Sequence, residues 1–116
     1  MPRDMSKHQA FVRDLHARFA EAGFHRVRFH DEDEGWRVMP TVDALLEEVF
    51  SVDECHVSFR NLDTGASTTL WLILCNSAWE TVADLGGNDE GLAVADPLTS
   101  ALADEYLARD MEVRHG

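Results

Sequence analysis

The sequence predicts a single α+β domain in which a mainly antiparallel sheet of about four to five strands carries two to three helices. The chain of 116 residues is close to the common size of one domain. It begins with apolar residues at helical spacing and continues with short alternating segments separated by turn residues. Because these patterns follow one another roughly as α-β-β-α-β-β-β-α, residues 1–116 should form one sheet with helices packed on it.

The N-terminal segment is predicted to be an amphipathic helix of about four turns. Apolar residues recur every three or four positions from Met5 to Ala22, which is the period of one helical face. Ser6 and Gln9 have the spacing of a capping box, and Gly23 is placed to end the helix.

A β-hairpin is expected next. Residues 24–30 and 36–38 alternate between apolar and polar side chains, which is typical of half-buried strands. The acidic run at 31–35 is the connecting loop. Pro40 ends the second strand because proline cannot donate a hydrogen bond to a neighbouring strand.

A second helix and a second hairpin follow. Thr41 is the expected N-cap of a helix whose apolar stripe lies within residues 42–50. Strands are predicted at 55–62 and 68–75, joined by a turn at 63–65, where Asp and Gly tolerate the backbone angles of a tight bend. The later strand is apolar on both faces, which is typical of the middle of a sheet.

The predicted register of this second hairpin determines whether the two cysteines lie opposite one another. A hairpin that pivots on Gly65 would bring three apolar pairs together on one face. These pairs are Phe59 with Trp71, Val57 with Ile73, and Cys55 with Cys75. We expect both cysteines to be buried, reduced thiols, and this register leaves a disulfide between them open as the alternative.

The C-terminal third is predicted to contain one more strand and one more helix. Residues 79–85 should add a strand to the sheet, although their apolar spacing also fits a helical turn. Residues 86–91 are expected to be a flexible loop. Asp96 and Pro97 are placed to start the last helix, which gives way to a frayed tail at 110–116.

The sequence also limits where the protein works. Its first residues carry no apolar run of the kind found in secretory signals. The longest apolar run, Leu70 to Cys75, is far shorter than the ~20 residues of a membrane span. We therefore expect a cytoplasmic protein that does not bind membranes.

Acidity is the strongest compositional signal. Twenty-two Asp and Glu residues against ten Lys and Arg residues give a formal net charge of −12. Residues 1–37 contain seven of each sign, whereas residues 38–116 contain fifteen acids and three arginines, so the later part carries the whole excess. A surface of this sign repels phosphate backbones and anionic lipids, which argues against direct binding of nucleic acid.

No motif predicts catalysis, a metal or a cofactor. The acidic loop from His30 to Glu34 lacks the alternating ligand spacing of a calcium loop, and zinc-type pairs of cysteine or histidine are absent. Cys55 and His56 cannot act together because neighbours on a strand point to opposite faces. We predict no catalytic residue, no metal site and no cofactor, and interpret the histidines as ordinary surface or boundary residues.

The uneven acidity leads to the functional hypothesis of a non-enzymatic protein-binding module. Its acidic face would occupy a basic surface of a partner, such as a nucleic-acid-binding protein or complex, and inhibit it, as small phage or mobile-element proteins that mimic DNA do. The candidate partner-binding residues are Asp43, Glu47, Glu48, Asp53, Glu54, Asp89 and Glu90. The alternatives are a small-ligand or metal-dependent enzyme with a pocket between sheet and helices, a structural homodimer, and acidity that serves only solubility or host adaptation.

Overall fold

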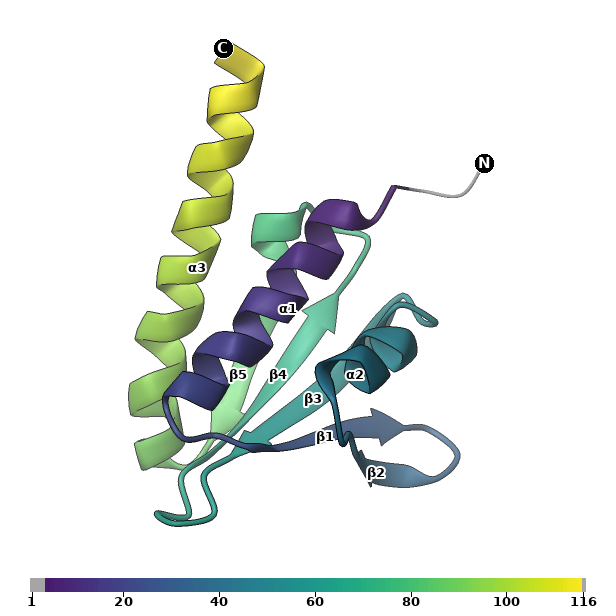
Figure 1. The fold of residues 1–116 in the computed structure, drawn as a ribbon, viewed down its shortest axis with the longest axis vertical. Coiled ribbons are helices and arrows are strands. Elements are labelled where there is room, and N and C mark those ends of the chain that lie inside the picture. The colour runs from purple at the N-terminus through teal and green to yellow at the C-terminus, as the bar shows by residue number, and fades with distance from the viewer. Residues whose placement is uncertain (1–3, 116) are drawn as a thin grey trace.

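The elements follow one another in the predicted order α-β-β-α-β-β-β-α (Figure 1). The computed structural model describes residues 4–115, with side chains described for residues 4–112. In chain order the elements are α1 (Ser6–Glu21), β1 (Arg26–Asp31), β2 (Gly35–Val38), α2 (Val42–Val49), β3 (Glu54–Arg60), β4 (Ser67–Ile73), the 3-10 helix η1 (Ala78–Glu80), β5 (Val82–Gly87) and α3 (Asp89–His115).

The five strands form one sheet in the order β2-β1-β3-β4-β5, and every neighbouring pair is antiparallel. Helices α1, α2 and α3 cover one face of this sheet (Figure 1). The opposite face is not covered by any element of residues 4–115. The predicted α+β class and the single compact domain are therefore confirmed.

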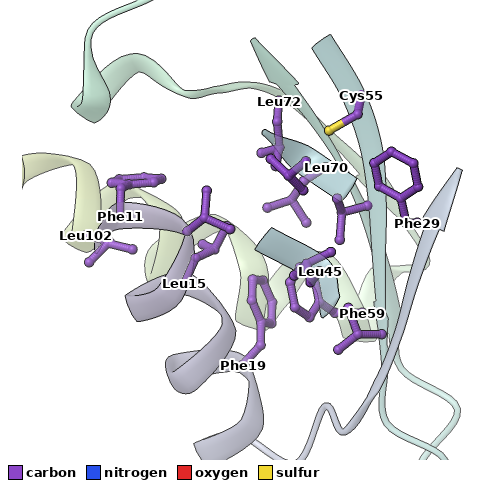
Figure 2. Close-up of a cluster of buried hydrophobic side chains, with 14 of the residues drawn as sticks. Phe11, Leu15, Phe19, Phe29, Leu45, Cys55, Phe59, Leu70, Leu72 and Leu102 are labelled. Carbon is purple, nitrogen blue, oxygen red and sulfur yellow. The ribbon is translucent and has the colours of Figure 1, made fainter. Parts of the chain in front are cut away.

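The core lies between the helices and the covered face of the sheet (Figure 2). Phe19 of α1 stacks on Phe59 of β3, with ring centroids 4.3 Å apart and planes 12° from parallel. Leu45 of α2 and Leu102 of α3 are fully buried and complete the contact of all three helices with this core. Burial of such side chains is the main stabilising term in a domain of this size.

Helix α1 ends as predicted but begins differently. The amide of Gly23 donates to the carbonyl of Ala20, and the amide of Phe24 donates to that of Phe19, which together make a Schellman cap. Gly23 has φ of +92°, a left-handed conformation that favours glycine. The predicted capping box is absent, because the carboxylate of Asp4 accepts hydrogen bonds from the amide and hydroxyl of Ser6.

The first hairpin and α2 form where the sequence predicts them. Strands β1 and β2 pair across the acidic loop, with His30 directly opposite Trp36. The hydroxyl of Thr41 accepts a hydrogen bond from the amide of Ala44 at 3.1 Å, so Thr41 is the N-cap of α2, as predicted.

The predicted register of the β3–β4 hairpin is wrong by three residues. Val57 lies opposite Leu70 and not Ile73. The turn is centred earlier than Gly65, because the side-chain oxygen of Asn61 accepts hydrogen bonds from the amides of Asp63 and Thr64. The amide of Asn61 also donates to the carbonyl of Ala66, which closes the loop. The sequence did not reveal the shift, because a strand that is apolar on both faces fits either register equally well.

An odd shift exchanges the two faces of β4, so three predicted cross-strand pairs do not form. Phe59 lies opposite Thr68, and Cys55 lies opposite Leu72. Trp71 is therefore on the uncovered face and not in the core. Cys55 is buried as predicted, but Cys75 is exposed, and the register that suggested a disulfide between them does not occur.

The segment 79–85 contains both of the structures that its pattern allowed. Its first residues lie in η1, and the chain then enters β5, which continues through Gly86 and Gly87. These two glycines were expected in a flexible loop. Gly87 pairs with Thr68, and a Cβ there would come within 2.2 Å of the Ser67 carbonyl oxygen, so this strand approaches β4 too closely for a side chain.

Helix α3 starts seven residues before the predicted Asp96-Pro97 start. The side-chain oxygen of Asn88 accepts a hydrogen bond from the amide of Gly91 at 2.9 Å and so provides the cap. Pro97 lies inside the helix, where it removes one backbone donor. The helix continues through residues 110–115, predicted as a frayed tail, and residue 116 lies outside the described part. None of the described helices has the length and apolar character needed to cross a membrane.

Candidate functional site

Five of the seven predicted partner-binding acids are on α2 or follow it. Asp43, Glu47 and Glu48 are in the helix, and Asp53 and Glu54 lie where the chain enters β3. The side chains of Asp43, Glu47, Asp53 and Glu54 are exposed, and Glu48 is half-buried. Within residues 4–112, Glu47, Asp53 and Glu54 form no ion pair. Three of the five acids at this end of the molecule are therefore not neutralised by a cation of the described residues.

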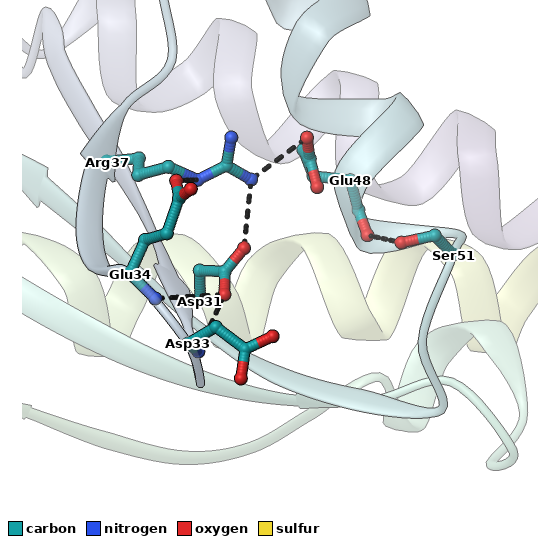
Figure 3. Close-up of polar contacts among 6 residues, drawn as sticks. All are labelled: Asp31, Asp33, Glu34, Arg37, Glu48 and Ser51. Atoms are coloured by element: carbon teal, nitrogen blue, oxygen red, sulfur yellow. Dashed lines mark hydrogen bonds and ion pairs between the residues drawn. The ribbon is translucent and has the colours of Figure 1, made fainter.

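Two of these acids are already used within the fold. Asp43 accepts a hydrogen bond from Arg13 of α1 at 2.9 Å. Glu48 lies 2.9 Å from the guanidinium of Arg37, which reaches from β2 to α2 (Figure 3). The Glu48 carboxylate raises the pKa of Arg37, chiefly by accepting this hydrogen bond. Asp43 and Glu48 therefore join elements to one another as well as adding charge to the surface.

The acidic loop is organised around the same arginine. The Asp31 carboxylate accepts hydrogen bonds from the amides of Asp33 and Glu34, at 2.8 and 3.2 Å, and lies 3.3 Å from Arg37 (Figure 3). The two amides, followed by the charge of Arg37, lower the pKa of Asp31. The loop is thus a solvated turn tied to its own backbone amides and to one cation.

Asp89 and Glu90 are at the opposite end of the sheet from the α2 acids. They form the first turn of α3, directly after β5. Gly87 at the end of β5 pairs with Thr68, whereas Glu54 at the start of β3 pairs with Ile73. The seven predicted acids therefore make two separate acidic surfaces, one around the exit of α2 and one at the start of α3.

Arginines gather on the uncovered face of the sheet. Arg26 and Arg28 of β1 and Arg60 of β3 all project from this face, and none has an ion pair with another described residue. The guanidinium of Arg28 lies 5.3 Å from the ring centre of Trp36, as in a cation–π contact. The cations that are paired with acids lie elsewhere. Lys7, Arg13 and Arg18 are on α1, and Arg37 is at a position of β2 that faces the helices.

A row of four rings followed by one carboxylate crosses the same face, with one residue from each strand. In order across the sheet the row is Trp36, His30, His56, Trp71 and Asp84. The ring of His30 lies 5.1 Å from that of Trp36 and 6.4 Å from that of His56. His56 stacks almost parallel on Trp71 at 6.2 Å. Trp36 is 40% exposed, so the row presents aromatic surface to a ligand or partner.

Sequence reasoning missed this row because it depends on register. The wrong pivot assigned Trp71 to the core, although a signal was present in the strand itself. Leu70, Leu72 and Leu74 alternate with Thr69 and Trp71, and a uniform leucine set is the better candidate for the buried face. That comparison would have placed Trp71 beside His56.

Several hollows lie on the surface of the described residues, and two of them are lined by a tryptophan. One of about 220 Å³ lies on the uncovered face among His56, Thr69, Trp71 and Asp84. A mainly apolar one of about 280 Å³ is lined by residues of α1, η1 and α3, including Trp79. The first adds depth to the aromatic row, and both are smaller than or at the lower limit of the ~300–1,000 Å³ that encloses a small ligand.

Three groups with catalytic potential have structural roles. Burial raises the pKa of the Cys55 thiol to about 12, so it remains protonated and unreactive. His8 is buried, and its Nε2 donates to the Asn76 carbonyl oxygen at 2.6 Å. Burial, and then a hydrogen bond donated to Asp14, raises the pKa of Tyr106 to about 12. Over residues 4–115, no three His, Cys, Asp or Glu side chains are placed to hold one metal ion.

Compared with models of known protein families, with curated proteins and with solved structures, this chain finds no match in any of the three.

Proposed function

We propose that this protein is a non-enzymatic binding module of the cytoplasm that engages a basic surface of a partner protein through its exposed acids. The observation that supports this most directly is the distribution of ion pairs. Glu47, Asp53, Glu54, Asp89 and Glu90 are exposed and have no ion pair with any described residue. Negative charge that the fold does not neutralise is free to attract a cationic partner.

The partner class follows from this charge. A protein that binds nucleic acid carries a basic surface matched to phosphates, and an acidic module can occupy that surface in their place. Attraction between opposite charges speeds the encounter and selects the partner. The proposed outcome is inhibition of a nucleic-acid-binding protein or complex by occlusion of its basic surface.

The experiment compares three double variants that each remove two negative charges. Glu47→Gln/Asp53→Asn neutralises the α2 side, and Asp89→Asn/Glu90→Gln neutralises the start of α3. Asp104→Asn/Glu112→Gln is the matched control, because these acids are exposed and form no ion pair with a described residue but are not among the predicted binding residues. Each immobilised variant is used to capture proteins from a lysate of the source cells at low and at high salt.

We expect basic proteins to be captured by the wild type at low salt and released by salt, since screening weakens the attraction. At least one of the two test variants should bind them on the order of tenfold more weakly, and the control should bind like the wild type. Added DNA or RNA should compete for the captured protein. Partners of neutral or acidic character, or equal losses in all three variants, would contradict the proposal.

A further inference from the structure

The uncovered face of the sheet is divided into an acidic end and a basic end. The central strand of the five is β3, whose outward side chains run from Glu54 through His56 and Ser58 to Arg60. Glu54 and Arg60 are exposed, and neither forms an ion pair with a described residue. The strand at the middle of the face thus carries opposite charges at its two ends.

Neighbouring strands repeat this division. At the basic end, Arg26 lies directly opposite Arg60 on the adjacent strand. Like charges in directly opposed positions destabilise a sheet, and the described residues provide no acid to offset them. The loop that follows β1 adds exposed Glu32 and Asp33 at the same end of the sheet as Glu54, because β1 runs antiparallel to β3. On β1 and β3 the two ends of this face therefore carry opposite charges, whereas Asp89 and Glu90, at the same end of the sheet as Arg60, belong to α3 on the covered side.

We propose that two copies of this chain pair through their uncovered sheet faces, about a two-fold axis that crosses the middle of β3. A two-fold axis that lies between the two faces and runs across the strands presents each end of β3 to the opposite end of β3 in the second copy. Glu54 of each copy then faces Arg60 of the other, and Arg26 faces the acidic loop. Face-to-face sheets keep their strand directions within about 30° of one another, which this superposition of β3 on β3 satisfies.

Side-chain sizes fit the same axis. The axis lies between the row that contains Trp36 and Trp71 and the next row, which contains Val38 and Thr69. Trp71 of one copy is thereby placed over the smaller Thr69 of the other, and Trp36 is placed over Val38. Trp36 and Val38 are 40% and 50% exposed, so this contact would remove exposed apolar surface from water.

The size of the face sets the expected strength of pairing. The five strands are about 4.8 Å apart and contain four to seven residues each at ~3.3 Å per residue, which gives roughly 500 Å² of flat area per copy. This value is below the ~800 Å² per partner of a standard interface. We therefore expect a dimer that forms at micromolar concentrations and dissociates on dilution.

The first test is the mass in solution without any partner. Sedimentation equilibrium of the full chain should give 13.1 kDa at the lowest concentrations and twice that mass in the range above about 100 μM. Added salt should shift the monomer–dimer transition to higher protein concentration, because four contacts of the proposed dimer are between opposite charges. The acids tested with partner proteins, Glu47, Asp53, Asp89 and Glu90, lie outside the strands of this face, so failure of one proposal does not imply failure of the other.

Charge reversal then tests the register. Arg60→Glu and Glu54→Arg should each remain monomeric, because each makes both central contacts repulsive. An equimolar mixture of the two variants should recover a dimer of twice the mass, since both contacts are again between opposite charges. Glu47→Arg is the matched control, because its exposed site on α2 is off the face and the wild-type dimer should persist.

Several results would overturn the inference. These are a wild type that stays monomeric at about 1 mM, a dimer that tolerates Arg60→Glu, and a mixture of the reversed variants that stays monomeric. A monomer whose tryptophan fluorescence changes on adding a basic protein or a single-stranded oligonucleotide would assign this face to that ligand and reject self-pairing. Recovery in the mixture also shows that both variants are folded.

Discussion

The two faces of the sheet are built on different principles. On the covered face, Phe59, Leu70 and Leu72 are buried beneath three helices, and Arg13, Arg18 and Arg37 on that side are paired with acids. On the uncovered face, rings remain partly exposed, and Arg26 and Arg60 oppose one another without an acid among the described residues. The covered face provides what folding requires. The uncovered face has features that folding does not require, which is why we assign it to interaction.

The largest expected difference between the faces is at two adjacent residues of β4. Leu72 is buried in the core, whereas Ile73 is half-buried on the other face. Leu72→Ala should lower the free energy of unfolding by about 3 kcal/mol, through lost apolar contact and the cavity left behind. Ile73→Ala removes a side chain of equal size and should cost about 1 kcal/mol. Urea denaturation at a low protein concentration measures both, and equal losses would contradict the assignment of faces.

A smaller difference is expected between two arginines. Arg37 joins the first hairpin to α2 through Asp31 and Glu48, so Arg37→Gln should lower the midpoint of thermal unfolding, by less than Leu72→Ala. Arg60→Gln removes a like-charge contact with Arg26 and should leave the midpoint unchanged or raise it. Repeating the melts at high salt should shrink both effects. A larger loss for Arg60→Gln would mean that the uncovered face is needed for folding.

The smallest expected effect is a dependence of the stability on pH in the alkaline range, caused by a tyrosine on the covered side. The pKa of Tyr106 is raised from its ordinary value of 10 to about 12, mainly by burial and then by the hydrogen bond to Asp14. A raised pKa means that the folded state holds the proton more tightly. The resulting stability is present below about pH 10 and is lost as pH rises toward about 12. Tyr106→Phe lacks this titration, so the difference in stability between wild type and variant should decrease over that range, and a constant difference would contradict it.

Much of the fold could be predicted because local signals and tertiary structure agree. Three such signals each depend on residues that are close in sequence: the apolar stripe of α1, the glycine cap at Gly23 and the N-cap at Thr41. Where two local signals competed, long-range contacts decided between them. Asp96 and Pro97 form a good helix start, yet α3 begins after Asn88, because Gly91 packs against β4 so closely that a Cβ would lie 1.8 Å from the Ser67 carbonyl oxygen.

The candidate surfaces were predictable only in part. The excess of acids and the exposure of residues such as Glu47 follow from sequence pattern alone. The convergence of Arg26, Arg28 and Arg60 does not, because it depends on which strands are neighbours and in what register. A turn held by the Asn61 side chain shifted that register by three residues and moved Trp71 to the other face. Pairing between distant segments thus determined the surface, and a single sequence shows it weakly.

The side chain of Asn88 has a consequence for the order of folding. Its oxygen accepts hydrogen bonds from the amides of Ser67 and Gly91, and its nitrogen donates to the Gly65 carbonyl oxygen. Forming the first turn is the costly step for any helix, and here that turn shares its cap with the β3–β4 hairpin. We expect the closed hairpin to favour nucleation of α3, because the hairpin holds the capping side chain of Asn88 in place. The hairpin and the first turn of α3 should open together as one cooperative unit during native-state fluctuations.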